Sequence, residues 1–256
     1  MHRFDLKGKV ALVTGGNGGI GQGIARGLLE CGAQVVIAGR NDAKNKAAVA
    51  ELSKIGSPVS AFVLDVTDDE QSRAAVQEVV RRYGKLNILV NNAGIGSPGV
   101  PVSPDQMSRD TFEKVIGTNL TAVFVMSQLA YPEMKKAGGG KIINIGSMAS
   151  YMGAPNWTAY GSSKGGVVQL TKNCAAAWAK DNIQVNAILP GWIDTDLTKP
   201  GQANTEFNSH VIARTWANRI GTPDDFAGIG AFLSSSASDF ITGTDIQVDG
   251  GLLWSV

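Results

Sequence analysis

Residues 10–21 read VALVTGGNGGIG, a short apolar run that leads directly into a glycine-rich turn. Gly15 permits a tight turn, Gly19 lets the backbone approach a pyrophosphate, and Gly21 allows a helix to pack closely on the strand before it. The helix that follows would offer free N–H groups to the phosphates. A purely structural turn is the alternative, but the position at the end of an apolar strand favours a nucleotide site.

Further apolar runs follow at fairly regular intervals, most of them succeeded by a stretch with helical spacing. This alternation predicts a parallel sheet covered by helices on both faces. An eight-stranded α/β barrel is the main competitor, but we count seven strands, and barrel phosphate sites usually follow the last strands rather than the first. We therefore predict one α/β domain, residues 1–256, with a doubly wound (Rossmann) fold. The expected strands are residues 10–13, 35–37, 59–66, 86–90, 141–145, 183–189 and 245–248, and the expected helices are residues 20–29, 43–52, 72–80, 112–134, 158–179 and 223–234.

Composition excludes several classes of protein. The chain has 256 residues, enough to bury a large core, and its 23 basic and 22 acidic residues give no footprint for nucleic acid or for a membrane surface. Asp5 and Lys7 interrupt any signal-peptide pattern, and no stretch approaches the ~20 apolar residues of a membrane-spanning helix. Cys31 and Cys174 lie in apolar, helix-like contexts, typical of small buried side chains rather than a redox pair. We expect a cytoplasmic protein without a metal site.

The ends of the next strands indicate the ligand, because open parallel sheets bind ligands beyond the carboxyl ends of their strands. The second strand ends without a carboxylate but with Arg40, which suits a 2′-phosphate and predicts NADP in preference to NAD; an exposed surface arginine is the alternative. Asp65 ends the third strand, where it could accept a hydrogen bond from adenine or cap the helix beginning at Asp68. Residues 91–94, Asn-Asn-Ala-Gly, end the fourth strand and either leave room for a ring or form an ordinary turn.

Tyr160 and Lys164 lie four residues apart in a helical stretch, so their side chains share one face. A neighbouring ammonium stabilises a phenolate, which makes Tyr160 a candidate general acid and base for a substrate hydroxyl or carbonyl. Ser147 ends a strand upstream and can donate a hydrogen bond to a developing oxyanion. Tyr131 and Lys135 have the same spacing but no such upstream serine, so we interpret them as structural.

The order of these motifs resembles that of the short-chain dehydrogenase/reductase family, from residues 8–15 to residues 248–251. The resemblance implies that Tyr160 exchanges the proton and that Lys164 lowers the pKa of this phenol and holds the nicotinamide ribose. It also implies that Ser147 orients the substrate oxygen and that Asn119 keeps a water between Lys164 and solvent. The residues expected at the cofactor are Gly15, Asn17, Gly18, Gly19, Ile20, Gly21, Arg40, Asp65, Val66, Asn91, Ala93, Gly94, Tyr160, Lys164, Pro190, Gly191, Ile193 and Thr195.

Two positions depart from the family pattern. Many relatives that prefer NADP carry a basic residue where this chain has Gly18, so Arg40 would act alone on the 2′-phosphate. Gly146 stands where many relatives have a second serine, a change from which we expect little effect.

Residues 191–221 are long and polar, and we predict that they form a helical lid over the substrate. Ser147, Met148, Asn156, Tyr160 and Trp192 are the expected substrate contacts; Met148 and Asn156 could equally pack a subunit contact. Within the family the overall pattern resembles gluconate- and deoxygluconate-type dehydrogenases and 3-oxoacyl-carrier-protein reductases.

These features together predict reversible oxidation of a secondary alcohol to a ketone, on a small hydroxylated substrate such as a sugar acid or polyol. A 3-oxoacyl-carrier-protein reductase is the enzymatic alternative, and a nicotinamide-nucleotide sensor is the alternative without catalysis. Small residues within 160–179 and the apolar end at residues 252–254 indicate a homo-oligomer, a tetramer or a dimer, although burial in the monomer core would explain them too.

Overall fold

Within residues 3–96 and 103–254, which the computed structural model describes, seven parallel strands form the centre of the molecule. Their order is β3-β2-β1-β4-β5-β6-β7, so the direction of progression along the sheet reverses between β1 and β4. This is the topology of a doubly wound α/β fold, with its switch point beside β1. The predicted fold class is confirmed. The strands are β1 (Val10–Thr14), β2 (Gln34–Gly39), β3 (Val59–Val63), β4 (Ile88–Asn91), β5 (Gly140–Ile145), β6 (Ile183–Pro190) and β7 (Asp245–Val248).

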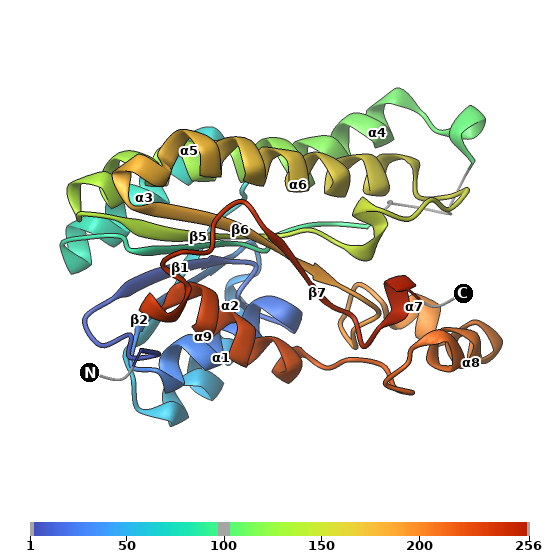
Figure 1. The fold of residues 1–256 in the computed structure, drawn as a ribbon, viewed down its shortest axis with the longest axis horizontal. Coiled ribbons are helices and arrows are strands. Elements are labelled where there is room, and N and C mark those ends of the chain that lie inside the picture. The colour runs from blue at the N-terminus through green and yellow to red at the C-terminus, as the bar shows by residue number, and fades with distance from the viewer. Residues whose placement is uncertain (1–2, 97–102, 255–256) are drawn as a thin grey trace.

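Helices cover both faces of the sheet, as Figure 1 shows. Alternate residues of β1 serve the two layers, because successive strand side chains point to opposite faces. Ala11 and Val13 pack with α1 and α9, whereas Val10 and Leu12 pack with α3 and α5. The two layers thus bury both faces of β1. One layer holds α1 (Gly19–Glu30), α2 (Asp42–Leu52) and α9 (Ala227–Ser234), and the other holds α3 (Asp69–Tyr83), α4 (Arg109–Ile116), α5 (Ala122–Lys136) and α6 (Thr158–Trp178).

Strand register brings the carboxyl ends of β1, β2 and β4 together at one end of the sheet. Thr14, the last residue of β1, lies opposite Ala38 of β2 and Asn91 of β4. The glycine-rich turn after Thr14 therefore lies beside the chain that follows β2 and the chain that follows β4. Parallel strands bring these carboxyl ends together although they are distant in sequence.

Several element boundaries differ from the predicted ones: α3, for example, spans Asp69–Tyr83 rather than residues 72–80, and three other differences have a local cause. β3 ends at Val63 rather than at residue 66, because the chain turns there and Asp65 bonds to Thr67. The helix expected over residues 112–134 is divided into α4 and α5 by a π-helical turn, Gly117–Thr121. Asn119 within this turn directs its amide at the backbone of Ile95. The helix expected at 223–234 begins with a 3₁₀ turn, Pro223–Phe226.

The predicted lid contains two helices, α7 (Lys199–Gln202) and α8 (Thr205–Arg214). Both lie beside the carboxyl ends of the strands, next to the C-terminal end of the described chain (Figure 1). Its helical content is therefore as expected from the sequence.

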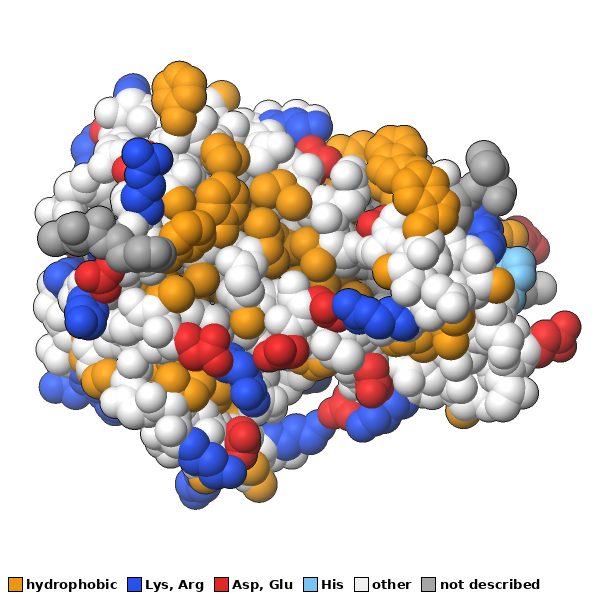
Figure 2. All heavy atoms as spheres, turned by 60° about the horizontal axis from the view of Figure 1, so that its bottom comes forward, with side chains coloured by type: hydrophobic (Ala, Val, Ile, Leu, Met, Phe, Trp, Pro, Cys, Tyr) orange, Lys and Arg blue, Asp and Glu red, His pale blue; other side chains and the backbone are white. Residues whose placement is uncertain are grey.

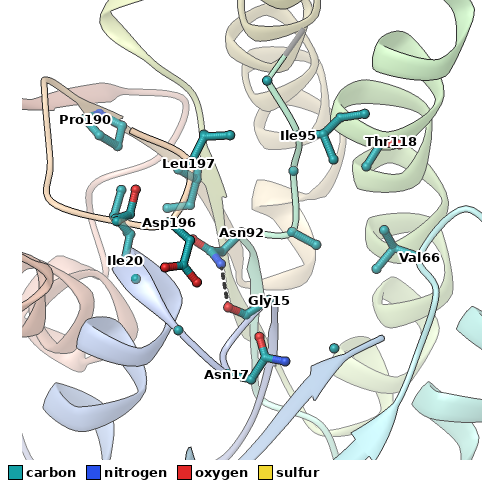
Figure 3. A pocket seen from close by; sticks show the side chains of 18 of the residues that line it. Gly15, Asn17, Ile20, Val66, Asn92, Ile95, Thr118, Pro190, Asp196 and Leu197 are labelled. Carbon is teal, nitrogen blue, oxygen red and sulfur yellow. Dashed lines mark hydrogen bonds between the residues drawn. The ribbon is translucent and has the colours of Figure 1, made fainter. Parts of the chain in front are cut away.

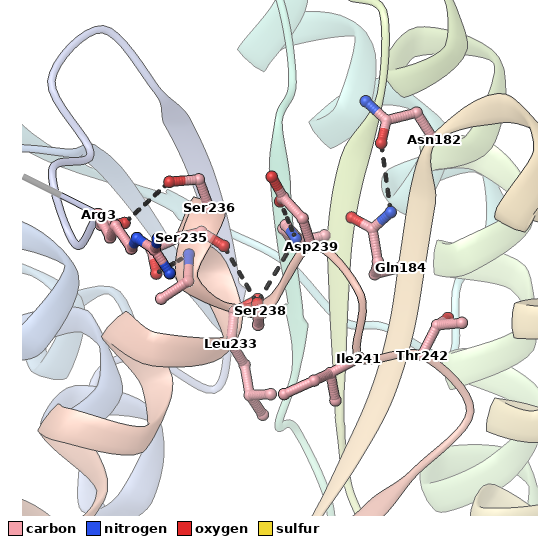
Figure 4. Close-up of polar contacts among 12 residues, drawn as sticks. Arg3, Asn182, Gln184, Leu233, Ser235, Ser236, Ser238, Asp239, Ile241 and Thr242 are labelled. Carbon is pink, nitrogen blue, oxygen red and sulfur yellow. Dashed lines mark hydrogen bonds and ion pairs between the residues drawn. The ribbon is translucent and has the colours of Figure 1, made fainter. Parts of the chain in front are cut away.

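The connection from α9 to β7 is tied to the rest of the molecule by polar side chains (Figure 4). Ser238 Oγ donates to the carbonyl of Leu233 at 3.1 Å, and the backbone N–H of Val185 donates to Thr242 Oγ1 at 3.1 Å. The half-exposed ion pair of Lys141 with Asp239, at 2.8 Å, lies at the same end of the sheet. These contacts hold β7 against β6, so the end of β7 lies beside the end of β6 at the site.

No helix within the described residues is long and apolar enough to cross a membrane. On the face drawn in Figure 2, acidic, basic and hydrophobic side chains are interspersed. Cys31 and Cys174 are free thiols, and burial raises the pKa of Cys174 to about 11. A thiol in that environment stays protonated and unreactive near neutral pH.

Candidate active site

A cleft of about 580 Å³ opens at the carboxyl ends of the strands (Figure 3). Its volume lies within the range of small-molecule and cofactor sites. Residues that are as far apart in sequence as Gly15 and Thr198 meet in it, as the parallel topology requires. The predicted site residues that line it are Gly15, Asn17, Gly18, Gly19, Ile20, Arg40, Asp65, Val66, Ala93, Gly94, Ser147, Tyr160, Lys164, Pro190, Gly191, Ile193 and Thr195.

The glycine-rich turn has the shape that an anionic ligand needs. Gly15 and Gly19 have φ of +63° and +50°, which favour glycine over other residues. A Cβ built on Gly18 would meet nothing within 4 Å, so the space above the turn is open. Gly18 is also the N-cap of α1 and supplies no side-chain cap, which leaves the N–H groups of the first helical turn for a ligand. These residues fit a dinucleotide.

Gly21 acts beneath the cleft rather than in its lining. A Cβ at Gly21 would lie 2.4 Å from Asn92 Nδ2 and 2.5 Å from the carbonyl oxygen of Gly15. Asn92 Nδ2 donates to the carbonyls of Thr14 and Gly15, at 3.0 and 3.1 Å (Figure 3). Gly21 therefore makes room for the amide that fixes the turn, which is a packing role.

Asn45 is a site residue that sequence reasoning missed. Asn17 Nδ2 donates to Asn45 Oδ1 at 2.7 Å, and Asn45 Nδ2 donates to the carbonyls of Gly39 and Phe62, at 2.8 and 2.9 Å. One almost fully buried amide thus braces the glycine-rich turn against the ends of β2 and β3. An asparagine on the apolar side of α2 was the available signal, since a buried amide needs partners.

The ends of β2 and β3 carry one cation and one carboxylate. Arg40 is exposed and lies near enough to Asp65 to lower the pKa of that carboxyl. The larger cause of the lowered pKa is hydrogen bonding, because Asp65 Oδ1 accepts from the N–H and the hydroxyl of Thr67, at 3.0 and 2.7 Å. The cap of α3 is instead Asp68, which accepts from Glu70 N and Gln71 N. The alternative interpretation of Asp65 as the cap of this helix is therefore wrong.

Ser147, Tyr160 and Lys164 meet at the other end of the cleft. Lys164 Nζ lies 5.8 Å from the centre of the Tyr160 ring and donates to the carbonyl of Ile145 at 2.8 Å. Ser147 Oγ accepts from Ala149 N at 3.1 Å, and its hydroxyl lies near enough to Tyr160 to lower the pKa of the phenol. The predicted serine, phenol and ammonium are thus brought together by the end of β5 and the first turns of α6.

Burial governs the protonation of this group. It raises the pKa of the Tyr160 phenol, and the hydrogen bond from Ser147 opposes that shift. Burial also lowers the pKa of Lys164 to about 8. The expected lowering of the Tyr160 pKa by Lys164 is not found, because the ammonium is directed at a backbone carbonyl and desolvation of the phenol is the larger effect.

Asn119 lies beneath the cleft and is fully buried. Its Oδ1 accepts from Ile95 N at 2.8 Å, and its Nδ2 donates to the carbonyl of Ile95 at 2.9 Å and to Ser163 Oγ at 3.2 Å. A Cβ on Gly94 would lie 3.2 Å from Asn119 Oδ1 and 3.7 Å from Lys164 Nζ. The asparagine therefore stands next to the lysine, separated from the cleft by Gly94.

Besides Gly21 and Asn119, four predicted site residues do not line the cleft. Asn91 is buried and donates to Ser127 Oγ and Asn144 Oδ1, at 3.0 and 2.9 Å. Its neighbour Asn92 lines the cleft instead, because adjacent side chains at the end of a strand point to opposite sides. The other three, all substrate expectations, are Met148, Asn156 and Trp192.

Met148 and Trp192 belong to a small apolar cluster that includes Val211 of α8 and Leu252. Trp192 packs edge-on against Phe207 of α8, with ring centres 5.2 Å apart, and lines a separate cavity of about 360 Å³. Sequence analysis did not reveal this packing for Met148, because Val211 of α8, which packs in the same cluster, lies far from it along the chain.

The tyrosine and lysine pair interpreted as structural lies elsewhere. Tyr131 stacks on Trp178, with ring centres 4.9 Å apart, and its hydroxyl donates to Asp181 at 2.8 Å. Lys135 forms an ion pair with the same carboxylate at 3.0 Å. Neither residue lines the cleft.

Comparisons with known proteins agree with this geometry. A family model described as enoyl-(acyl carrier protein) reductase matches residues 15–253. The chain is 40% identical to a 2-dehydro-3-deoxy-D-gluconate 5-dehydrogenase of Formosa agariphila, over 99% of this chain and 96% of that protein. It superposes with a TM-score of 0.95 on a putative short-chain alcohol dehydrogenase from Sinorhizobium meliloti, 36% identical and covering both chains completely. A gluconate 5-dehydrogenase from Burkholderia cenocepacia in complex with NADP and tartrate is 39% identical, with a TM-score of 0.93 and coverage of 99% and 98%.

Proposed function

The chain belongs to the short-chain dehydrogenase/reductase family and is an oxidoreductase, and from this premise we propose that it oxidises a secondary alcohol of a sugar acid to the ketone with NADP. The observation that carries the proposal is the placement of Ser147, Tyr160 and Lys164 in one cleft with Arg40. A proton-transfer group and a phosphate-binding group thus serve the same elongated ligand site. The names of the similar proteins, gluconate and deoxygluconate dehydrogenases, support the substrate class.

The residues of the cleft divide among the parts of the dinucleotide. The turn at Gly15–Gly19 would hold the pyrophosphate, Arg40 the 2′-phosphate, and Asp65 with Val66 the adenine. When bound, the nicotinamide supplies or accepts the hydride, and the protein supplies position and protons. The residues that would surround the nicotinamide half are Ala93, Gly94, Tyr160, Lys164, Pro190, Gly191, Ile193 and Thr195.

Tyr160 is the group that exchanges the proton of the substrate hydroxyl. Ser147, which lies near enough to the phenol to lower its pKa, would orient the substrate oxygen and stabilise charge that develops on it. Lys164, with its pKa lowered to about 8, can pass a proton near neutral pH. Asn119 Oδ1 and Lys164 Nζ both lie within 4 Å of the position that a Cβ on Gly94 would take. This closeness supports a role for Asn119 in keeping a water between the lysine and solvent.

The substrate would enter beside Ser147 and Tyr160, under the lid of residues 191–221. Arg40, with no carboxylate at the end of β2, supports NADP over NAD. Similarity to a 3-oxoacyl-(acyl-carrier-protein) reductase of Chlamydia pneumoniae, 36% identical over 97% of this chain, supports reduction of a 3-oxoacyl thioester as the second candidate.

A screen with both nicotinamide cofactors tests the proposal. The protein would be incubated with NADP⁺ or NAD⁺ and gluconate, 2-dehydro-3-deoxy-D-gluconate or a neutral polyol, and separately with NADPH and a 3-oxoacyl thioester. We expect reduced nicotinamide to form fastest with NADP⁺ and a sugar acid. Turnover of the thioester alone would favour the second candidate, and binding of nucleotide without any turnover would identify a sensor.

We also propose a homo-oligomer, a tetramer or a dimer, that works in the cytoplasm. Ala176 and Ala177 of α6 are exposed, as is Phe124 of α5 at 46%. Small exposed residues let a partner helix approach, and an exposed aromatic ring suits a subunit contact. The two free thiols fit a reducing compartment. Light scattering of the purified protein measures the subunit number, and a monomer at micromolar concentration would contradict the oligomer.

A further inference from the structure

An ion pair spans the nucleotide cleft between two segments that are remote in sequence. Lys44 Nζ, from the first turn of α2, lies 2.8 Å from Asp196 Oδ2, from the loop that leads into the lid. Both residues line the cleft. Figure 3 shows the Asp196 side chain pointing into the cleft, above the turn that carries Gly15.

Asp196 has a second cationic partner besides Lys44. Asp196 also pairs with Lys199 Nζ at 2.7 Å, and these two ammonium groups lower the pKa of its carboxyl to about 2. The carboxylate therefore keeps a partner if Lys44 leaves. The side chains of Lys44 and Asp196 are 59% and 67% exposed, and an ion pair that exposed holds its partners weakly.

Lys44 and Arg40 both come from the junction between β2 and α2. Asn41, the residue after Arg40, caps α2 and accepts the backbone N–H of Lys44 on its side chain at 2.9 Å. The two cations thus project from one strand-to-helix junction and line the same end of the cleft. That junction follows β2, where the 2′ position of a bound adenine ribose is read in this fold.

We propose that Lys44 is a second specificity-determining cation for the 2′-phosphate of NADP, and that Asp196 holds it in position until the phosphate takes the place of the carboxylate. A phosphate carries a charge of about −1.5 to −2, against −1 for a carboxylate, so it competes for the ammonium where a hydroxyl does not. NAD would leave the pair of Lys44 and Asp196 intact. This inference rests on the proposed use of a nicotinamide nucleotide, and it modifies the expectation that Arg40 acts alone.

Equilibrium binding of NADPH and NADH to the full chain, followed by calorimetry, tests the role of Lys44 without requiring turnover. Lys44→Ala should weaken NADPH about tenfold and leave NADH within about twofold, since a charged contact to the 2′-phosphate is lost. Lys46→Ala is the matched control: Lys46 lies on the same helix and pairs with Asp42 at 2.7 Å. It should leave both affinities within about twofold.

Asp196→Asn tests the exchange itself. It removes the competitor for Lys44 and a negative charge near the phosphate, so NADPH should bind about threefold more tightly and NADH should be unchanged. Equal weakening of both nucleotides by Lys44→Ala would overturn the inference, because it would place the lysine on the shared pyrophosphate. If Asp196→Asn weakened the binding of both nucleotides, the proposed replacement of the Asp196 carboxylate by the 2′-phosphate would be overturned. If the unmutated protein bound neither nucleotide, the proposed function itself would fail.

Discussion

Replacing Lys164 with methionine should change how the stability of the protein depends on pH. Burial lowers the pKa of this lysine from its ordinary value of 10.5 to about 8. At neutral pH both the folded and the unfolded chain carry the proton, so the full penalty of the buried charge opposes folding. Between pH 8 and 10.5 the folded chain has lost the proton and the unfolded chain still holds it, so stability rises with pH.

The size of that rise follows from the shift. Integrating the proton linkage gives a gain of about 2 kcal/mol between about pH 7 and about pH 9.5. In a chain of this size the gain corresponds to an increase of roughly 4–8 °C in the melting temperature. The range stops below the ordinary pKa of tyrosine, because the raised pKa of Tyr160 contributes with the opposite sign above it. The raised pKa of Cys174 opposes the gain within the range, but it does so with and without Lys164, so the difference between the two proteins isolates the lysine.

The assay is thermal unfolding of the unmutated protein, Lys164→Met and Lys172→Met across this pH range. Lys164→Met should lack the rise of about 2 kcal/mol, whereas Lys172→Met should keep it, because the Lys172 side chain, on the same helix, is 46% exposed. If Lys164→Met and the unmutated protein showed parallel pH profiles, the pKa of Lys164 would not be lowered in the folded chain, and the reasoning from its burial would be refuted.

Three further substitutions test the packing and the division between structural and catalytic residues. Gly27→Ala should destabilise the fold by about 2 kcal/mol or more in urea unfolding, since its Cβ would lie 2.1 Å from the carbonyl oxygen of Ala227. Gly228→Ala is the control: Gly228 is exposed, and a Cβ there would meet nothing within 4 Å, so this change should be neutral or stabilise the fold by about 0.5 kcal/mol. Asn91→Ala should cost about 3 kcal/mol of stability by unpairing buried groups, yet change NADPH affinity by less than about twofold, and a large loss of affinity would return Asn91 to the cofactor site. Tyr131→Phe should lower the unfolding free energy by about 1 kcal/mol and leave turnover unchanged, so loss of turnover would contradict its structural assignment.

The sheet could be predicted from the sequence because burial on both faces leaves an unmistakable pattern. All five residues of β1 and the four central residues of β2 are buried, and such strands appear as continuous apolar runs bounded by polar turns. The glycine-rich turn could also be predicted, since its backbone requires glycine at positions of positive φ such as Gly15 and Gly19. Both features depend on short-range geometry.

The parts of the site that were not predicted depend on contacts between distant segments. The choice between Asn91 and Asn92 depends on which side of the strand end faces the cleft, and two adjacent asparagines look alike in sequence. The contact between Lys44 and Asp196 joins residues 152 positions apart and has no local signature. The pKa of Tyr160 depends on what buries the phenol, which is fixed only when the sheet and the helices have packed.

The claim that Tyr160 is the proton-exchanging group is tested most directly by one comparison of turnover with binding. Tyr160→Phe would be assayed with NADP⁺ and the sugar acid that the unmutated protein oxidises fastest, beside calorimetric binding of NADP⁺ to both proteins. We predict a loss of at least about 10²-fold in kcat, with NADP⁺ affinity within about threefold, because the phenol supplies proton transfer rather than most of the binding contacts. Retention of kcat within about threefold in Tyr160→Phe would contradict the assignment of this phenol as the catalytic acid and base.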